Sequence, residues 1–553
     1  MKRKLLPLSV AAAISAPSVH AAMYINELGT GETLLFPFYS AENGNNTLVN
    51  VANATNDHKA VKVRIIEARN SQEVLDFNLY LSPQDHFSFA ISETPESVNS
   101  QGFTVGGAKI VTQDNSCTSP AIPEEGEPFR TFLFEDDEAN SVTRTQVGYI
   151  EVIEMGQLDP SAAPVIDRSG IANGTAINAA AAITHDTNGV PANCDIVNYA
   201  WGTDAEGDGV WLAESKTTTN TGNSEFLANW SGGGLYGYAT VINVPDGAAF
   251  GYDAIAIADH VADGATGHAM HYKPGDIYPN FTDPAMDTAA IVSLNGRAVT
   301  LDFSGEYPSA GVERIQALNA TIMATEVYND FVTDPDIAAT TDWLFNFPTK
   351  TFHVSGVTEP IEPFSQLWGG SSACEPTAFY SVDREESQPA QPPAPGPSGP
   401  DFSPAPPTPP GPAPSNNDLP LCYESTIVQF ASESAAETSQ VAVGINAFLE
   451  SDDGWAVISF DPNQIASTLG KCDIDGDKNA NIDAKDPCTR TIDAGDGQLI
   501  GLPVVGFAVQ KYVNGNVNND PSGQGVLANY AIATAHKKCR SGTGTVANDC
   551  SDR

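Results

Sequence analysis

Oxygen-bearing side chains recur at nearly every second residue between Asp473 and Asp486. If the loop is counted from its second aspartate, such side chains fall at positions 1, 3, 5, 9 and 12, and position 7 offers a backbone carbonyl. Carboxylate, amide and carbonyl oxygens at this spacing are the ligands that a hard cation prefers. We therefore predict a Ca²⁺ site formed by Asp475, Asp477, Asn479, Asn481, Asp483 and Asp486.

This loop resembles the calcium loops of EF-hands, dockerins and thrombospondin type 3 repeats, and the likeness covers only these residues of the chain. Apolar Ile482 stands at position 8, as in those families. The resemblance implies bound Ca²⁺ as a cofactor. The sequence departs from the pattern at Ala480, where the families use Gly for a sharp turn, and at Asp486, where EF-hands use a bidentate Glu. A solvated acidic loop is the alternative, although acidity alone does not produce this period.

A second cluster contains three histidines close together in the sequence, His260, His268 and His271. Imidazole is a ligand of zinc, copper and iron, so the cluster is a candidate transition-metal site. The spacing matches no motif that fixes a coordination geometry, and solvated loop histidines are the alternative interpretation.

Recognisable catalytic motifs are missing from the sequence. It contains no GxSxG nucleophile elbow, no HExxH zinc motif, no GxxxxGK[ST] phosphate loop and no GxGxxG after a strand. Paired carboxylates for glycoside hydrolysis are defined by their separation in space, which the sequence does not reveal. No catalytic residue is therefore assigned, and a non-enzymatic function is favoured.

The composition is strongly acidic, with 69 Asp and Glu against 26 Lys and Arg and a net charge of −43. Polyphosphates repel such a chain, so nucleic acid is excluded as a partner. Hydrophobic residues make up 41% of the sequence, which is enough for packed cores.

The N-terminus has the order of a secretory signal peptide: basic residues at 2–4, an apolar run at 5–14 and small residues before position 22. We expect residues 1–21 to be removed. No later segment has the length of apolar sequence that a membrane span needs. The protein is therefore expected to be secreted or at the cell surface, with the periplasm as an alternative.

An even number of cysteines in an exported chain favours disulfides over metal thiolates. Sequence neighbours suggest four pairs, although spacing alone does not fix the connectivity. The third of these pairs would hold both ends of the predicted calcium loop. In chain order the candidates are Cys117, Cys194, Cys374, Cys422, Cys472, Cys488, Cys539 and Cys550.

Short segments rich in Val, Ile and Phe alternate with Gly, Asn, Asp and Pro, which predicts a mainly β protein. We expect an immunoglobulin-like antiparallel β-sandwich over 22–155 and a second β-rich region over 156–385. That region contains one helix, predicted over 312–331 from an apolar stripe at helical spacing. A proline-rich linker follows over 386–418, and a C-terminal β-rich domain with the calcium loop over 419–553.

These features favour an exported, disulfide-bonded, calcium-stabilised structural or adhesion protein. Its partners would be further copies of itself, surface polysaccharide or other surface proteins. The alternative is a secreted hydrolase acting on polysaccharide, in which the C-terminal domain is an accessory binding module.

Overall fold

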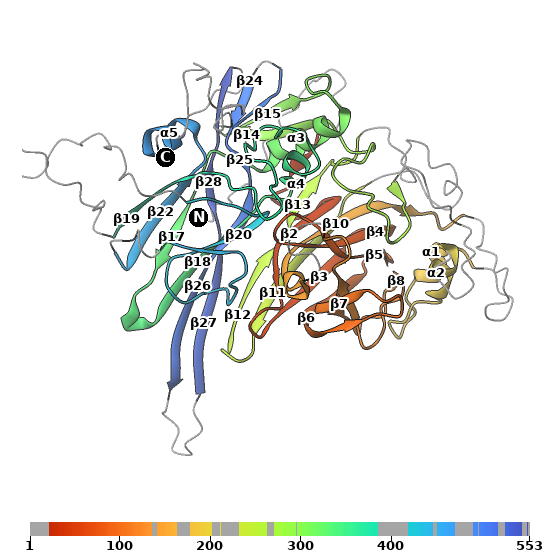
Figure 1. The fold of residues 1–553 in the computed structure, drawn as a ribbon. Helices are drawn as coiled ribbons and strands as arrows, with labels where there is room; N and C mark the ends of the chain where they lie inside the picture. Colours follow the sequence, from red (N-terminus) through yellow and green to blue (C-terminus); the bar gives the residue numbers. More distant parts are fainter. Residues whose placement is uncertain are drawn as a thin grey trace, which may run out of the picture.

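The computed structural model describes residues 22–134, 141–162, 177–201, 211, 232–262, 270–294, 296–384, 419–445, 449, 451–469, 490–495, 497–517, 526–544 and 550. The protein is mainly β, with 48% of residues in strands and 11% in helices. Its larger sheets form two sandwiches that lie side by side, and Figure 1 shows the first in red to yellow-green and the second mainly in green and blue.

The first sandwich consists of a seven-stranded and a six-stranded sheet. Every strand pair in both sheets is antiparallel, and the two inner faces share one apolar core. In sheet order, the seven strands are β1 (Tyr24–Ile25), β13 (Ile255–Ala258), β2 (Thr33–Ser40), β10 (Val147–Leu158), β4 (His58–Glu67), β5 (Glu73–Leu81) and β8 (Cys117–Ser119). The six are β12 (Ala248–Asp253), β11 (Leu235–Asn243), β3 (Asn45–Asn53), β6 (His86–Val98), β7 (Thr104–Val111) and β9 (Glu127–Arg130). β11, β12 and β13 follow residue 155 in the sequence, so the first sandwich includes strands from beyond the predicted module of 22–155.

The second sandwich consists of a four-stranded and a five-stranded sheet around a core rich in aromatic residues. The four strands are β19 (Ala378–Asp383), β22 (Asp453–Ser459), β17 (Glu326–Val332) and β28 (Lys537–Cys539). The five are β21 (Ala442–Gly444), β20 (Ser425–Gln429), β18 (Ala339–Asn346), β26 (Val505–Val517) and β27 (Val526–Ala535). Strands on both sides of the predicted linker share both sheets, so the boundary at 386–418 does not separate two sheet systems.

The outer face of the five-stranded sheet packs against the first sandwich. A separate apolar cluster joins them, with Leu344 and Phe507 on one side and Phe38 and Phe250 on the other. The ring of Phe507 stacks on Tyr252 with centroids 4.6 Å apart. The central strands of the five-stranded sheet are therefore buried on both faces.

Smaller elements cover the ends and edges of the sandwiches. They are β14 (Ala289–Leu294) with β15 (Arg297–Asp302), β16 (Met323–Ala324) with β25 (Leu502–Pro503), and the three-stranded sheet β23 (Thr491–Asp493), β24 (Gly497–Ile500) and β29 (Ser541–Gly544). The helices are α1 (Ala179–Ile183), α2 (Asp195–Trp201), α3 (Ala310–Ile322), α4 (Thr351–Val354) and α5 (Pro462–Leu469), with 3₁₀ turns η1 (Val142–Gln146) and η3 (Pro335–Ile337). None of the helices within the described residues is long and apolar enough to cross a membrane.

The predicted helix over 312–331 is wrong beyond residue 322. α3 begins after Ser309, whose hydroxyl accepts a hydrogen bond from the Val312 N–H, and ends at Ile322. The chain then enters β16 and β17, where Val327 and Phe331 face the core at a period of two. The apolar stripe continued across the boundary because buried strand residues can also fall at helical spacing.

Candidate functional site

The six predicted Ca²⁺ ligands lie outside the described residues, but the segments before and after them are anchored in the second sandwich. Before the loop, Ile465 of α5 is fully buried, and this helix packs on β19. After the loop, the fully buried Arg490 donates a hydrogen bond to Glu375, with Nη2 and Oε2 3.1 Å apart. Glu375 follows the disulfide-bonded Cys374. The predicted calcium loop therefore connects two fixed points of one packed unit.

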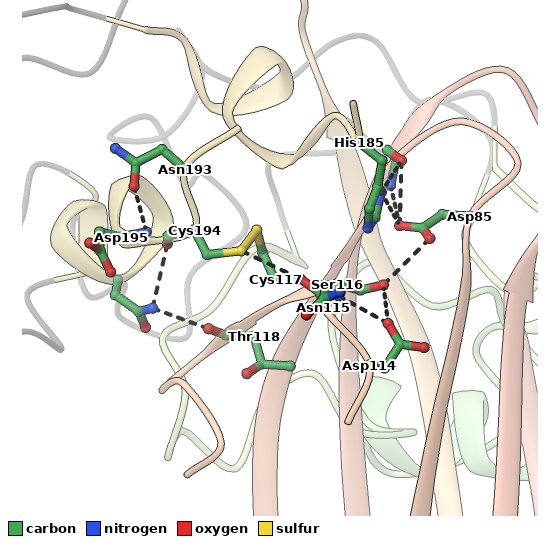
Figure 2. Close-up of a disulfide and its surroundings, with 12 residues drawn as sticks. Asp85, Asp114, Asn115, Ser116, Cys117, Thr118, His185, Asn193, Cys194 and Asp195 are labelled. Atoms are coloured by element: carbon green, nitrogen blue, oxygen red, sulfur yellow. Dashed lines mark hydrogen bonds and ion pairs between the residues drawn. A yellow bond between two sulfur atoms is a disulfide. The ribbon is translucent and has the colours of Figure 1, made fainter. Parts of the chain in front are cut away.

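Three disulfides join the cysteine pairs suggested by sequence neighbours, Cys117–Cys194, Cys374–Cys422 and Cys539–Cys550. Cys472 and Cys488 lie outside the described residues. The first disulfide attaches the start of α2 to β8, as Figure 2 shows, and the Asn198 amide of that helix also donates to the Thr118 carbonyl at 3.2 Å. The second spans the predicted linker. Disulfides of this kind are typical of proteins from oxidising compartments.

His185 and Asp85 lie near the first disulfide (Figure 2), and Ser82 contacts both, but not in the geometry of a hydrolase triad. His185 Nδ1 lies 3.0 Å from Ser82 Oγ and 3.5 Å from Asp85 Oδ2. A catalytic histidine contacts the nucleophile through one ring nitrogen and the carboxylate through the other. Here the same nitrogen faces both groups, so the cluster is suited to fixing the surrounding loops.

The two histidines of the predicted transition-metal cluster that are described occupy separate buried environments. His260 Nδ1 lies 2.7 Å from Thr33 Oγ1, and His271 Nε2 lies 3.1 Å from the Tyr80 hydroxyl. Burial lowers the pKa of each to about 3, so both imidazoles are neutral. In the described parts of the chain, no group of three His, Cys, Asp or Glu could hold a metal ion. His268 lies outside those parts, and the metal site stays a prediction.

A cavity of about 370 Å³ lies between the two sandwiches. β1, β2, β12 and β13 line one side, and β17, β26, β27 and β28 line the other. Small or imino residues keep this volume open. Pro37 has no N–H to extend the pairing of β13 with β2, which stops at Leu35. On β27, Ala533 and Ala535 line the cavity, whereas the alternating Ile532 is exposed on the other face.

Gly506 lines the cavity on the side of the second sandwich, and a larger residue would not fit at this position. Its φ is +148°, and a Cβ there would lie 1.9 Å from the Leu344 carbonyl oxygen. Only glycine therefore lets β26 approach β18 so closely at this point. The next residue, Phe507, then fills the space beside Tyr252 and forms part of the apolar wall.

Lys538 supplies the one lysine ammonium among the described lining residues. Lys538 is exposed to solvent, although the protein atoms packed around its amine and the like charge of Arg540 lower its pKa to about 7. Nζ donates to the Val504 carbonyl at 3.3 Å. Within the described residues no carboxylate forms an ion pair with this ammonium, although Asp253 lines the cavity from β12.

His536 also lines the cavity, but its ring nitrogens are engaged in the second sandwich. Nε2 lies 3.1 Å from the Leu344 carbonyl, and Nδ1 lies 3.3 Å from the Asn329 amide. Its ring stacks on Phe345, and burial lowers its pKa to about 3. The imidazole is thus a neutral wall residue, which leaves Lys538 as the cation available to a ligand.

Sequence reasoning did not identify this cavity. Its walls come from strands that are distant in the sequence, and its lysine belongs to no motif. The one local signal is the alternation of alanine with larger residues in β27, which predicts a strand with little side-chain volume on one face. Whether another element fills that space depends on the tertiary arrangement.

Comparisons with known proteins found no match: no family model, no curated protein and no solved structure is similar to this chain.

Proposed function

We propose that this chain is an exported, calcium-stabilised structural or adhesion protein of the cell surface or extracellular space. The anchoring of both segments that flank the predicted calcium loop carries the proposal. Ca²⁺ bound between α5 and Arg490 would restrain a loop whose ends are already fixed, and so would stabilise the second sandwich. The mainly β architecture and the three disulfides suit a durable scaffold. We also propose that the first sandwich is of the immunoglobulin-like type.

Calcium would also allow these acidic molecules to associate with one another or with anionic surface polysaccharide. The test is sedimentation velocity of the oxidised chain from residue 22, in millimolar Ca²⁺ and then in chelator. Reversible assembly that depends on Ca²⁺ is the expected result. A compact monomer in both buffers would reject the assembly role and favour the secreted polysaccharide hydrolase, which release of sugars from glycan substrates would then detect.

The calcium loop itself is tested by Asp475→Ala and Asp483→Ala. Each variant removes a charged ligand, so its melting temperature should fall in Ca²⁺ and stay nearly unchanged in chelator. Glu433→Ala is the matched control, because Glu433 is an exposed carboxylate of the second sandwich far from the loop in sequence. Equal shifts in both buffers would reject the calcium assignment.

A further inference from the structure

The cavity between the sandwiches has the chemistry of a binding site for an amphiphile, and this inference does not depend on the calcium loop. Most of its wall is apolar, including Ile25, Val327, Val505 and Phe507. Water in such a space makes few hydrogen bonds, so an apolar molecule would displace it favourably. The volume also falls within the usual range of small-molecule sites, about 300–1,000 Å³.

The charge in this wall selects the kind of ligand. The Lys538 ammonium meets solvent at one end of a mostly apolar wall, where it can form a charge-assisted hydrogen bond with an anion. The chain carries a large excess of carboxylates, yet within the described residues none forms an ion pair with Lys538. Arg540 adds further positive charge nearby, and its own guanidinium donates to the Met323 carbonyl at 2.8 Å. The local potential at this wall therefore favours an anionic group, against the charge of the whole protein.

We propose that this cavity binds a small amphiphilic carboxylate whose acid group pairs with Lys538 Nζ and whose apolar body packs between the sandwiches. The volume lies near the small end of the usual range of ligand sites, about 300–1,000 Å³, which favours a small ligand. A medium-chain fatty acid has this size. Asp253 lies on the β12 side, and its repulsion orients the acid group toward β28.

The test is calorimetric titration of the oxidised chain with decanoate and with its neutral isostere, decanamide. Decanoate should bind about tenfold more tightly, because a charge-assisted hydrogen bond adds to the same apolar contact. Equal affinities would overturn the proposal, since they would show an apolar void without a head-group site. Failure of decanoate to bind would overturn it as well.

Two neighbouring lysines provide a matched pair of variants. Lys538→Met removes the cation and keeps the length of the apolar stem, so decanoate affinity should fall about tenfold to that of decanamide. Lys537→Met is the control, because Lys537 precedes it on β28 and does not line the cavity. Unchanged decanoate binding by Lys538→Met would contradict the assignment.

Ala535→Trp tests the location independently of charge. An indole at this position would fill part of the cavity, so binding of both decanoate and decanamide should be lost. Ile532→Trp, on the exposed face of the same strand, should leave both affinities unchanged. Melting curves of the two variants report whether each has folded. Retained binding in folded Ala535→Trp would place the ligand elsewhere and refute the proposal.

Discussion

Each sandwich contains a sheet whose central strands are buried on both faces, but the two sheets are covered in different ways. The outer face of the seven-stranded sheet carries buried charges, including Lys62, Arg64, Asp76 and Glu151. Arg64 donates to Glu151 at 2.5 Å and to Glu73 at 2.8 Å. The five-stranded sheet instead presents apolar side chains on both faces in its central part, where it meets the first sandwich.

The difference follows from the backbone that covers each sheet. Residues 270–283 lie over the charged face, and a loop has N–H and C=O groups that no neighbouring strand satisfies. Asp76 accepts from the Gly275 N–H at 2.9 Å, Lys62 donates to the Lys273 carbonyl at 3.4 Å, and Asn78 donates to the Tyr272 carbonyl at 2.9 Å. The five-stranded sheet meets other sheets, whose backbone groups are already paired. Buried polar side chains therefore satisfy the backbone of the covering loop, beside apolar residues such as Tyr80 and Ile153, whereas the contact between the sheets is mainly apolar.

The largest expected effect is the loss of a buried ion pair on the opposite, core-facing side of the seven-stranded sheet. Lys59 Nζ donates to Glu154 Oε1 at 2.6 Å, both side chains are fully buried, and Glu154 Oε2 accepts from the Gly233 N–H at 2.9 Å. Lys59→Met leaves the carboxylate without its counter-charge and should lower the free energy of unfolding by about 3–5 kcal/mol. Urea denaturation measures this loss.

An exposed pair of the same chemistry provides the control. Arg384 and Asp453 lie 3.1 Å apart at the surface of the second sandwich, with the Arg384 side chain 72% exposed. Arg384→Met should change the free energy of unfolding by less than about 1 kcal/mol. Similar losses in the Lys59 and Arg384 variants would mean that the Lys59–Glu154 pair is hydrated and that burial does not distinguish the two pairs.

The apolar contact between the sandwiches is tested by Leu344→Ala. Leu344 of β18 is buried in the cluster that joins the five-stranded sheet to the first sandwich. The truncation should lower the free energy of unfolding by about 3 kcal/mol, through lost burial and the remaining cavity. Leu367→Ala, at a position 39% exposed, is the control and should have a much smaller effect. A loss below about 1 kcal/mol for Leu344→Ala would show that the two sandwiches are only loosely packed.

Local strand structure could be predicted from the sequence, because it depends on alternation and on turn residues. In β5, Leu75, Phe77 and Leu79 alternate with polar residues, and the same period of two runs through residues 61–65 of β4. The pairing of strands could not be predicted. Ile255–Ala258 pairs with β2, and β18 pairs with strands on the far side of the linker. Tertiary packing decides such long-range pairs, and a local sequence pattern carries no information about it.

The candidate sites also differ in whether their residues are close in the sequence or distant. The three described disulfides join neighbours in the sequence, so spacing suggested them correctly. The cavity around Lys538 combines strands from both ends of the chain, and its chemistry becomes visible only when residues as distant as Ile25 and Phe507 line one space. The alternation in β4 likewise predicted a strand but not the loop that buries its charged side chains.

The smallest expected effect tests whether the same rule holds in the second sandwich. Asp342 is a fully buried carboxylate on β18, beside residues 434–436, and it accepts from Ser434 Oγ at 2.6 Å and from the Ala436 N–H at 2.9 Å. Burial raises its pKa to about 7, well above that of an unfolded aspartate. Between about pH 4 and 7 the folded state therefore binds more protons than the unfolded state, and this group gives the protein stability as the pH falls.

Asp342→Asn accepts the same two hydrogen bonds without the charge. The full linkage effect would be about 4 kcal/mol, and a buried amide without a partner costs roughly 1–3 kcal/mol. The variant should therefore be more stable than the wild type at pH 8 by about 1–3 kcal/mol, and this advantage should vanish or reverse by pH 5. Melting curves at both pH values measure the difference. If the advantage were the same at both pH values, Asp342 would not change its protonation state in this range. Its hydrogen bonds to residues 434–436 would then not explain why the carboxylate is buried.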